Sequence, residues 1–180
     1  MDSAIQLRDA GHADLQRILA LNRREQQHTS ALELSRLEQL HALAWHHRVA
    51  VADGEVVAFL LAMRDGAAYD GENFAWFAAR WRNFAYIDRI VVDPGHGGRG
   101  IARRLYEELF ALARQQGLDL VACEYNIKPP NPASRAFHQR LGFSEAGRQY
   151  VADGSKQVSM QTRTLTGDAA GPSPIPPLES

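Results

Sequence analysis

The stretch with the clearest chemistry is a glycine-rich segment between an apolar run and an amphipathic one. Residues 90–105 read IVVDPGHGGRGIARRL, with four glycines within six positions. In a strand–turn–helix unit, such glycines let the backbone approach an anion closely, and the first N–H groups of the helix point at it with the positive end of the helix dipole. Arg99, Arg103 and Arg104 can add charge-assisted contacts. The segment therefore predicts a phosphate-binding loop.

The same glycines allow two other interpretations. Residues 95–100, GHGGRG, fit the dinucleotide pattern G-x-G-x-x-G, which belongs directly after a strand and has an acidic partner about 20 residues further on. Here Asp93-Pro94 intervenes, and Glu124 lies a little beyond the expected distance. A P-loop is excluded because no Gly-Lys-Ser/Thr follows. A dinucleotide-binding oxidoreductase and a glycine turn without a ligand remain as alternatives.

Two acidic residues lie within otherwise apolar runs. Asp88 belongs to residues 85–92 and Glu124 to residues 118–125. A charged side chain inside such a strand costs several kcal/mol unless it is paired or hydrated, so each needs a partner or a function. Both are candidate general bases; for Asp88 the alternative is a salt bridge to Arg89 or to a neighbouring strand. We interpret Asp93 as a cap or turn residue and Cys123, the one cysteine, as a buried inert thiol.

Aromatic residues are concentrated in one part of the chain. Seven lie between positions 69 and 86, out of Phe 7, Tyr 5 and Trp 3 in total. They predict either a lid or apolar wall over a substrate, or a helix over residues 74–81 that packs on the sheet or on a dimer partner, and we favour packing. Trp76, Phe77 and Tyr86 are the candidate substrate-binding residues.

The elements that must position these residues follow from periodicity and turn signals. A strand over residues 4–8 and helices over 14–27 and 32–43 precede two hairpins, 45–63 and 143–163, each with an Asp-Gly turn. Between the hairpins, two nearly continuous apolar strands flank a helix that begins at Gly100, and a further helix follows Asn131-Pro132. Strand, helix, strand of this size is a right-handed parallel crossover. The fold class is α+β, layered α/β/α, with a mostly antiparallel sheet.

Length and composition are those of a globular protein. The 180 residues suffice for one domain over residues 1–166, followed by a proline-rich tail, 167–180, which we expect to be disordered. A net charge of −1 argues against nucleic acid and membrane partners.

The histidines show no metal-ligand spacing, so no metal is expected, and His46, His47 and His96 are interpreted as strand-surface and loop residues. The N-terminus lacks a signal-peptide core, so the expected location is cytoplasmic.

Two motifs resemble the GNAT superfamily of acyl-CoA-dependent N-acetyltransferases. The pyrophosphate loop of that family, [Q/R]-x-x-G-x-[G/A], matches residues 97–102, although glycine replaces Gln or Arg at position 97. Residues 131–143, NPASRAFHQRLGF, resemble N-x-x-[S/A]-x-x-F-Y-x-x-x-G-F, and the order of elements over about residues 4–165 agrees. The whole pattern is also similar to a bacterial subgroup of acetyltransferases whose acceptor is not defined. The resemblance implies the GNAT fold, with a sheet splayed between two parallel central strands.

The resemblance also implies a cofactor and its contacts. Acetyl-CoA would be the co-substrate, held in the gap between the two parallel strands, with a backbone N–H near Val92 on the thioester oxygen. Asn131 would contact the pantetheine arm and Ser134 the pyrophosphate or a ribose, although capping explains Asn131 equally well. The implied cofactor-binding residues are Ile90, Val91, Val92, Gly97, Gly98, Arg99, Gly100, Ile101, Ala102, Asn131, Ser134 and His138.

The implied reaction is acetyl transfer to a primary amine of a small molecule, an amino acid or a peptide N-terminus. Glu124 matches the base of the N-terminal-acetylating members, but the loop from it to Asn131 is two residues longer here. Asp88 is the other candidate, and a water chain in place of either acid is the third alternative. His138 stands where the family usually has the Tyr that protonates the CoA thiolate, and it either donates this proton or only binds the cofactor and packs its helix. Family members are often dimers, so the resemblance allows a homodimer without fixing the oligomeric state. The remaining alternative is a sensor that holds acyl-CoA without turnover.

Overall fold

A computed structural model describes residues 4–25, 29–166 and 174–175 of the chain. The chain divides into two compact units. The first comprises residues 1–63 and 87–111, and the second comprises residues 64–86 and 112–180. Strand β4, Phe84–Val92, and helix α4, Ile101–Gln115, each run from one unit into the other.

The remaining elements follow the order expected from the sequence. In chain order they are β1 (Gln6–Asp9), η1 (His12–Asp14), α1 (Leu15–Arg24), α2 (Leu34–Leu43), β2 (His46–Ala52), β3 (Glu55–Arg64), α3 (Glu72–Ala78), η2 (Pro94–His96), β5 (Leu120–Lys128), α5 (Pro132–Arg140), β6 (Ser144–Val151) and β7 (Lys156–Thr164).

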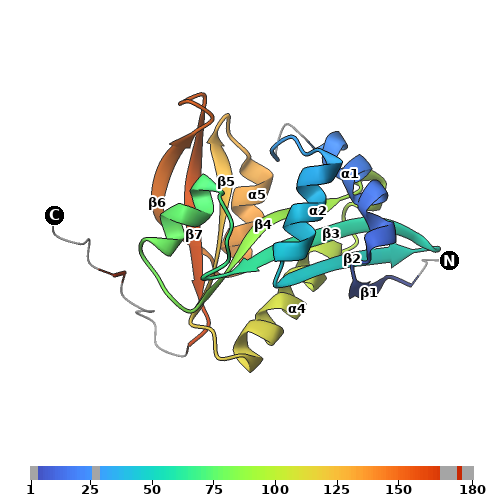
Figure 1. Ribbon diagram of the computed structural model, residues 1–180, viewed down its shortest axis with the longest axis horizontal. Helices are drawn as coiled ribbons and strands as arrows, with labels where there is room; N and C mark the ends of the chain where they lie inside the picture. Colours follow the sequence, from blue (N-terminus) through green and yellow to red (C-terminus); the bar gives the residue numbers. More distant parts are fainter. Residues whose placement is uncertain (1–3, 26–28, 167–173, 176–180) are drawn as a thin grey trace. The chain divides into compact units, whose positions relative to one another are not determined.

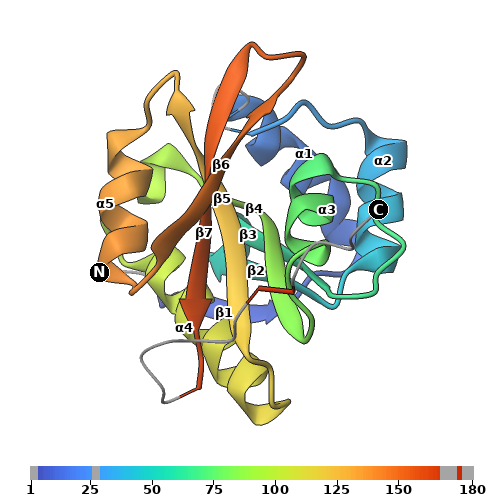
Figure 2. The ribbon, with the colours of Figure 1, turned by 90° about the vertical axis from the view of Figure 1, so that its left-hand side faces the viewer.

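The strands form one mixed sheet in the order β1-β2-β3-β4-β5-β7-β6 (Figures 1 and 2). The β4–β5 ladder is parallel and pairs Phe84, Ala85 and Tyr86 with Leu120, Val121 and Ala122. The β1–β2, β2–β3, β5–β7 and β7–β6 ladders are antiparallel. The predicted α+β class and the single parallel crossover are thereby confirmed.

The two Asp-Gly signals both mark hairpins. In the first, Ala52 pairs with Glu55 across Asp53-Gly54, and both turn residues have positive φ, 50° and 80°. This is the backbone of the tight hairpin turn whose twist matches that of the strands. In the second, Val151 pairs with Lys156, so the turn has four residues rather than two.

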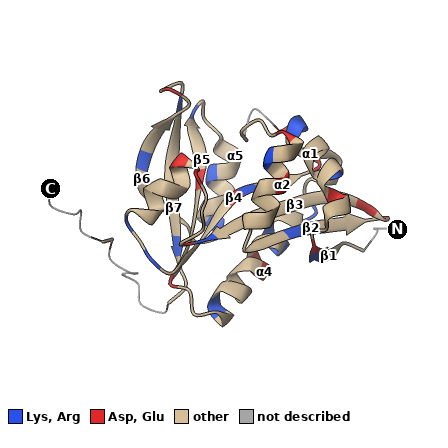
Figure 3. Cartoon of the chain, in the orientation of Figure 1, with Lys and Arg blue, Asp and Glu red and all other residues tan. Residues whose placement is uncertain are grey.

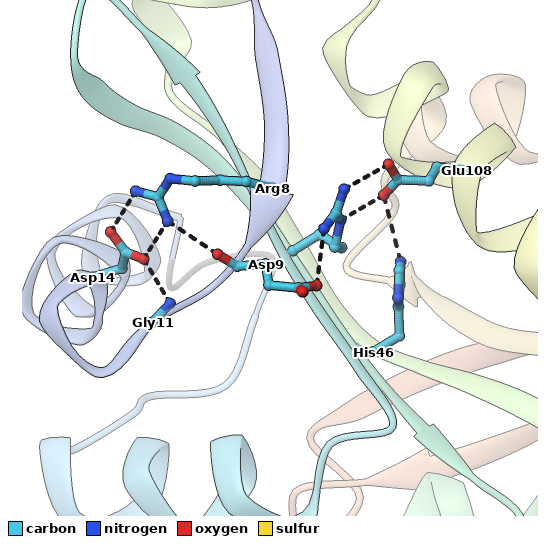
Figure 4. Close-up of polar contacts among 7 residues, drawn as sticks. Arg8, Asp9, Gly11, Asp14, His46 and Glu108 are labelled. Atoms are coloured by element: carbon cyan, nitrogen blue, oxygen red, sulfur yellow. Dashed lines mark hydrogen bonds and ion pairs between the residues drawn. The ribbon is translucent and has the colours of Figure 1, made fainter.

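In the first unit, helices cover both faces of the strands. Figure 1 shows α1 and α2 on one side of β2 and β3 and α4 on the other. Figure 4 shows polar contacts of this unit: Arg8 of β1 pairs with Asp14 of η1, and His46 of β2 lies 3.6 Å from the Glu108 carboxylate of α4. Arg48 donates two hydrogen bonds to Glu108, at 2.7 and 2.8 Å. Ion pairs therefore tie β1 to η1 and β2 to α4.

In the second unit, α3 and α5 lie on opposite faces of the β5, β7 and β6 strands (Figure 2). The Trp76 ring of α3 occupies the space beside Gly147 of β6, and the His138 ring of α5 stacks on Tyr125 of β5 at 5.6 Å. Because successive strand residues point to opposite faces, Glu124 points to the side of β5 opposite from Tyr125.

Charged residues of both signs are interspersed along the helices and strands, as Figure 3 shows. No helix among the described residues is long and apolar enough to cross a membrane. The predicted tail falls mostly outside the described residues. Of the tail, the structure describes residues 174 and 175, and the Ile175 N–H donates to the Arg80 carbonyl.

One expectation about exposure is wrong. His46 and His47 were expected on the strand surface, yet they are only 8% and 7% exposed. They point to opposite faces of β2, and both faces are covered, by α4 on one side and α2 on the other. Cys123 is buried, as predicted.

Candidate active site

The glycine segment forms a turn that leads from β4 into α4 within the first unit. The Asp93 carboxylate accepts a hydrogen bond from the Gly95 N–H at 2.9 Å, which confirms it as a cap of the η2 turn. Arg17 and Arg24 of α1 donate to the same carboxylate at 3.1 and 3.0 Å. The Gly95 N–H and then these two guanidinium groups hold the pKa of Asp93 below its ordinary value.

Two glycines leave the loop open on one side. Gly98 and Gly100 have φ of 75° and 72°, which side-chain-bearing residues rarely adopt, and a Cβ built on either would meet no atom within 4 Å. The loop therefore has open space on the side where these side chains would stand. Helix α4 begins at Ile101, directly after the loop, so its first backbone N–H groups lack partners within the helix.

The other cofactor-binding candidates of the first unit lie on β4 and at the start of α4. Ile90, Val92 and Ala102 are half-buried, whereas Val91 and Ile101 are buried at 3% and 1% exposure. Gly97 is exposed and has an ordinary φ of −60°. The buried pair contributes packing that anchors the loop, whereas Ile90 and Val92 remain partly exposed to solvent.

Asp88 forms an ion pair with Arg89, which is the alternative to a role as general base. The Arg89 Nε donates to the Asp88 carboxylate at 2.7 Å, and the two side chains are 6% and 4% exposed. Arg89 also donates to Asn22 at 3.1 Å and to the Ser30 hydroxyl at 3.0 Å. This buried network ties β4 to the segment that follows α1.

Glu124 has a different environment, in the second unit. It is half-buried on β5, and the Tyr86 hydroxyl lies 3.0 and 2.9 Å from its two carboxylate oxygens. Tyr86 itself is only 2% exposed. Two residues singled out separately from the sequence, one as a base and one as a substrate contact, are therefore hydrogen-bonded to each other.

His138 lies in α5 and is 4% exposed. Its Nδ1 is 2.7 Å from the Ser134 carbonyl oxygen, and because a carbonyl can only accept, Nδ1 carries the hydrogen. Burial lowers the pKa of His138, and the Ser134 carbonyl opposes this in part. The ring is therefore neutral at pH 7, with its lone pair on Nε2. Asn131 accepts from the Ser134 N–H at 3.2 Å, which confirms its capping role.

The aromatic segment is largely packed within the second unit. Phe74 and Phe77 of α3 are 4% and 0% exposed, and their rings lie 5.6 and 5.8 Å from that of Tyr86. Trp76 is half-buried, and the Arg80 guanidinium stacks on it at 3.8 Å. The helix spans Glu72–Ala78, somewhat earlier than expected, and its packing role holds in the structure.

Comparison with known proteins decides the family. The family described as "Acetyltransferase (GNAT) family" matches residues 13–143, which is most of the chain. The chain belongs to the GNAT acetyltransferase family. This confirms the resemblance drawn from residues 97–102 and 131–143.

Two curated relatives of this GNAT protein match over shorter stretches. It is 46% identical over 59 residues to a phosphinothricin N-acetyltransferase of Streptomyces coelicolor, covering 32% of this chain and 33% of the relative. It is 33% identical over 78 residues to the N-alpha-acetyltransferase RimI of Mycobacterium tuberculosis, covering 42% and 46%. The matched stretches thus span between a third and a half of these relatives.

Solved structures agree with the fold over nearly the whole GNAT chain. Ard1 from Thermoplasma volcanium superposes with a TM-score of 0.74 at 19% identity, covering 91% of this chain and 99% of that one. The structure of yncA from Salmonella typhimurium with its cofactor acetyl-CoA gives 0.68 at 22% identity, covering 93% and 97%. At this level of identity the likeness establishes the fold.

Proposed function

We propose that this protein transfers an acetyl group from acetyl-CoA directly to a primary amine bound beside it. The observation that carries the proposal is the open glycine turn at the start of α4, where Gly98 and Gly100 hold a positive φ with no neighbouring atom on that side. The names of the two curated relatives, both N-acetyltransferases, support an amine acceptor. The acceptor class is a small molecule, an amino acid or a peptide N-terminus.

The residues of the loop suit the phosphates of such a cofactor. The backbone N–H groups of residues 97–102 would hold the pyrophosphate, with Arg99 adding charge, and the backbone at Ile90 and Val92 would hold the pantetheine amides. In the second unit, Asn131 and Ser134 are the further cofactor-binding candidates. When bound, acetyl-CoA supplies an acetyl group activated as a thioester. A backbone N–H near Val92 would stabilise the oxygen on which negative charge develops.

Glu124 is the base that we propose. An amine acceptor is protonated at neutral pH and must lose a proton to attack. Glu124 is half-buried, so solvent still reaches this side chain, and an ionised carboxylate can accept that proton. Asp88 is less suited because its carboxylate neutralises the buried Arg89. Protonation of Asp88 would leave that guanidinium uncompensated, which is costly in a buried position.

We propose that His138 positions α5 rather than protonating the CoA thiolate. The neutral ring has one N–H, and that hydrogen is engaged with the Ser134 carbonyl. Donation from Nε2 would require the imidazolium form, which burial disfavours. The ring instead stacks on Tyr125 and packs edge-on against Phe143, which fixes the helix that bears Asn131 and Ser134.

Calorimetric titration with acetyl-CoA, CoA and NADH tests whether the protein binds the proposed cofactor. Micromolar binding of both CoA compounds without a response to NADH is expected. Binding of NADH alone would instead support the dinucleotide-binding oxidoreductase. Binding of acetyl-CoA without turnover of any amine in a broad panel would support the sensor.

The variants Glu124→Gln and Asp88→Asn test the choice of base. We expect Glu124→Gln to lower kcat by about 10²-fold, with partial recovery at high pH as free amine accumulates, and unchanged acetyl-CoA affinity. Glu145→Gln, which alters a carboxylate bonded to Ser159 in the same unit, serves as the control. If Glu124→Gln keeps the wild-type kcat and pH profile and folded Asp88→Asn instead loses activity, Asp88 is the general base.

A further inference from the structure

The hydroxyl of Tyr86 is a hydrogen-bond donor on the carboxylate proposed as the base. It lies 3.0 and 2.9 Å from the two oxygens of Glu124, so it meets the carboxylate between them. The two side chains come from neighbouring parallel strands, where Tyr86 pairs with Ala122, two residues before Glu124. One short ladder therefore sets their separation.

The Tyr86 ring is held in place by aromatic neighbours. Phe74 and Phe77 of α3 lie 5.6 and 5.8 Å from it at interplanar angles of 62° and 44°, and Tyr69 lies 6.4 Å away at 31°. Tilted and edge-on contacts of this kind favour one ring orientation. With the ring 2% exposed, the hydroxyl has little freedom to leave Glu124. This gives the aromatic segment a role that substrate contact does not explain.

On β4, the residue two positions after Tyr86 on the same face is Asp88, whose carboxylate is paired with Arg89. The ladder neighbour of Glu124 on β7 is Met160, and that of Met160 on β6 is Gly147, so neither strand places a charge directly beside it. The α3 region contributes Glu72, which is exposed, and Arg80, whose guanidinium is stacked on Trp76 and donates to the Trp76 carbonyl.

We propose that Tyr86 is a positioning residue for Glu124, and that the rings of Tyr69, Phe74 and Phe77 hold Tyr86 in place. A hydrogen bond donated to a carboxylate favours its ionised form, so the Tyr86 hydroxyl keeps Glu124 ready to accept a proton and fixes the direction in which it does so. The catalytic part of this inference rests on the proposed function, because it takes Glu124 as the base. The pairing itself does not.

Carbon-13 NMR titration of the glutamate carboxyl groups tests the pairing without any acceptor. The Glu124 resonance is assigned by its loss in Glu124→Gln. In Tyr86→Phe, which keeps the ring and removes the hydroxyl, we expect the Glu124 midpoint to rise by about one pH unit. Tyr125→Phe, which removes a buried hydroxyl bonded to Gln161 on the other face of β5, should leave it unchanged. An unchanged midpoint in folded Tyr86→Phe would overturn the inference.

The role of the aromatic rings is tested by Phe77→Leu. This variant keeps the Tyr86 hydroxyl but removes a ring beside it, and we expect the Glu124 midpoint to move part of the way toward that of Tyr86→Phe. A midpoint identical to the wild type would show that the rings do not hold the hydroxyl. Thermal unfolding of each variant establishes that the comparison is made between folded proteins.

Kinetics separate this inference from the proposed function. With phosphinothricin and a short peptide that has a free N-terminus as acceptors, Tyr86→Phe should lower kcat about tenfold and move the acidic limb of kcat/KM to higher pH, with the acetyl-CoA KM unchanged. The exposed Tyr150→Phe serves as the control. If Glu124→Gln is inactive but Tyr86→Phe has a wild-type rate and pH profile, the positioning role of Tyr86 is wrong while the proposed function stands. If Glu124→Gln is fully active, the proposed base fails, whatever the titration shows.

Discussion

At the residue scale, position 97 is where the loop departs from the family pattern, with glycine in place of Gln or Arg. Gly97 is exposed, has an ordinary φ of −60°, and a Cβ there would meet only the Pro94 carbonyl at 3.4 Å. A side chain is therefore tolerated here, in contrast to Gly98 and Gly100, whose positive φ would strain any other residue.

We predict that Gly97→Arg binds acetyl-CoA more tightly than the wild type. A guanidinium beside the loop would add a charge-assisted hydrogen bond to the pyrophosphate, which corresponds to about tenfold in Kd for about 1.4 kcal/mol. Calorimetry measures the change, and Gly97→Ala, which adds a Cβ without a donor, is the control. Unchanged or weaker binding in Gly97→Arg would mean that the loop holds the phosphates through its backbone alone.

At the element scale, the contact between α2 and β2 is sensitive to pH. The Nδ1 atoms of His41 and His47 lie 2.8 Å apart, and one hydrogen joins them. Burial, followed by the charge of His41, lowers the pKa of His47 from 6.5 to about 4. Between these two values the unfolded chain binds the proton and the folded protein does not, so stability falls as the pH drops.

We predict that His47 contributes a loss of about 3 kcal/mol in the free energy of unfolding as the pH is lowered from 7 to 4. Urea unfolding at a series of pH values measures it. His47→Gln should show a shallower pH dependence than the wild type, whereas His12→Gln, at an exposed histidine, should keep the wild-type slope. Equal slopes in His47→Gln and the wild type would contradict the assignment.

The packing of α3 on β6 depends on a missing side chain. A Cβ at Gly147 would lie 2.6 Å from Cζ2 of Trp76, closer than real atoms approach. We predict that Gly147→Val destabilises the protein by about 1–3 kcal/mol, because the Trp76 ring must shift. In a double-mutant cycle, the same substitution in a Trp76→Leu background should cost clearly less. Additive effects in the cycle would show that the indole is not the obstacle.

Local signals in the sequence predicted the elements better than they predicted the contacts between side chains. The Asp-Gly turns, the Asp93 and Asn131 caps and the crossover into α4 each follow from a few adjacent residues, and all are present. The Tyr86–Glu124 contact depends on the register between β4 and β5, which no local pattern encodes. The burial of His46 and His47 was missed because helices cover both faces of β2, a property of packing rather than of the strand itself.

At the scale of the whole molecule, the proposed machinery is divided between the two units. The glycine loop and Asp88 belong to the first unit, whereas Glu124, His138 and the Asn131 cap belong to the second. Two elements, β4 and α4, pass from one unit to the other. Cofactor-binding candidates therefore lie in each unit, residues 97–102 in the first and Asn131 and Ser134 in the second.

We predict that acetyl-CoA slows amide hydrogen exchange in both units. Protection should appear in residues 97–102, where backbone N–H groups hold the pyrophosphate, and around residues 131–134, where α5 begins. At 100 times Kd the cofactor should also raise the free energy of unfolding by about 2.7 kcal/mol. NADH at the same concentration is the control and should protect neither segment. Protection confined to residues 97–102 would mean that α5 serves the fold alone, and the assignment of Asn131 and Ser134 to the cofactor would have to be withdrawn.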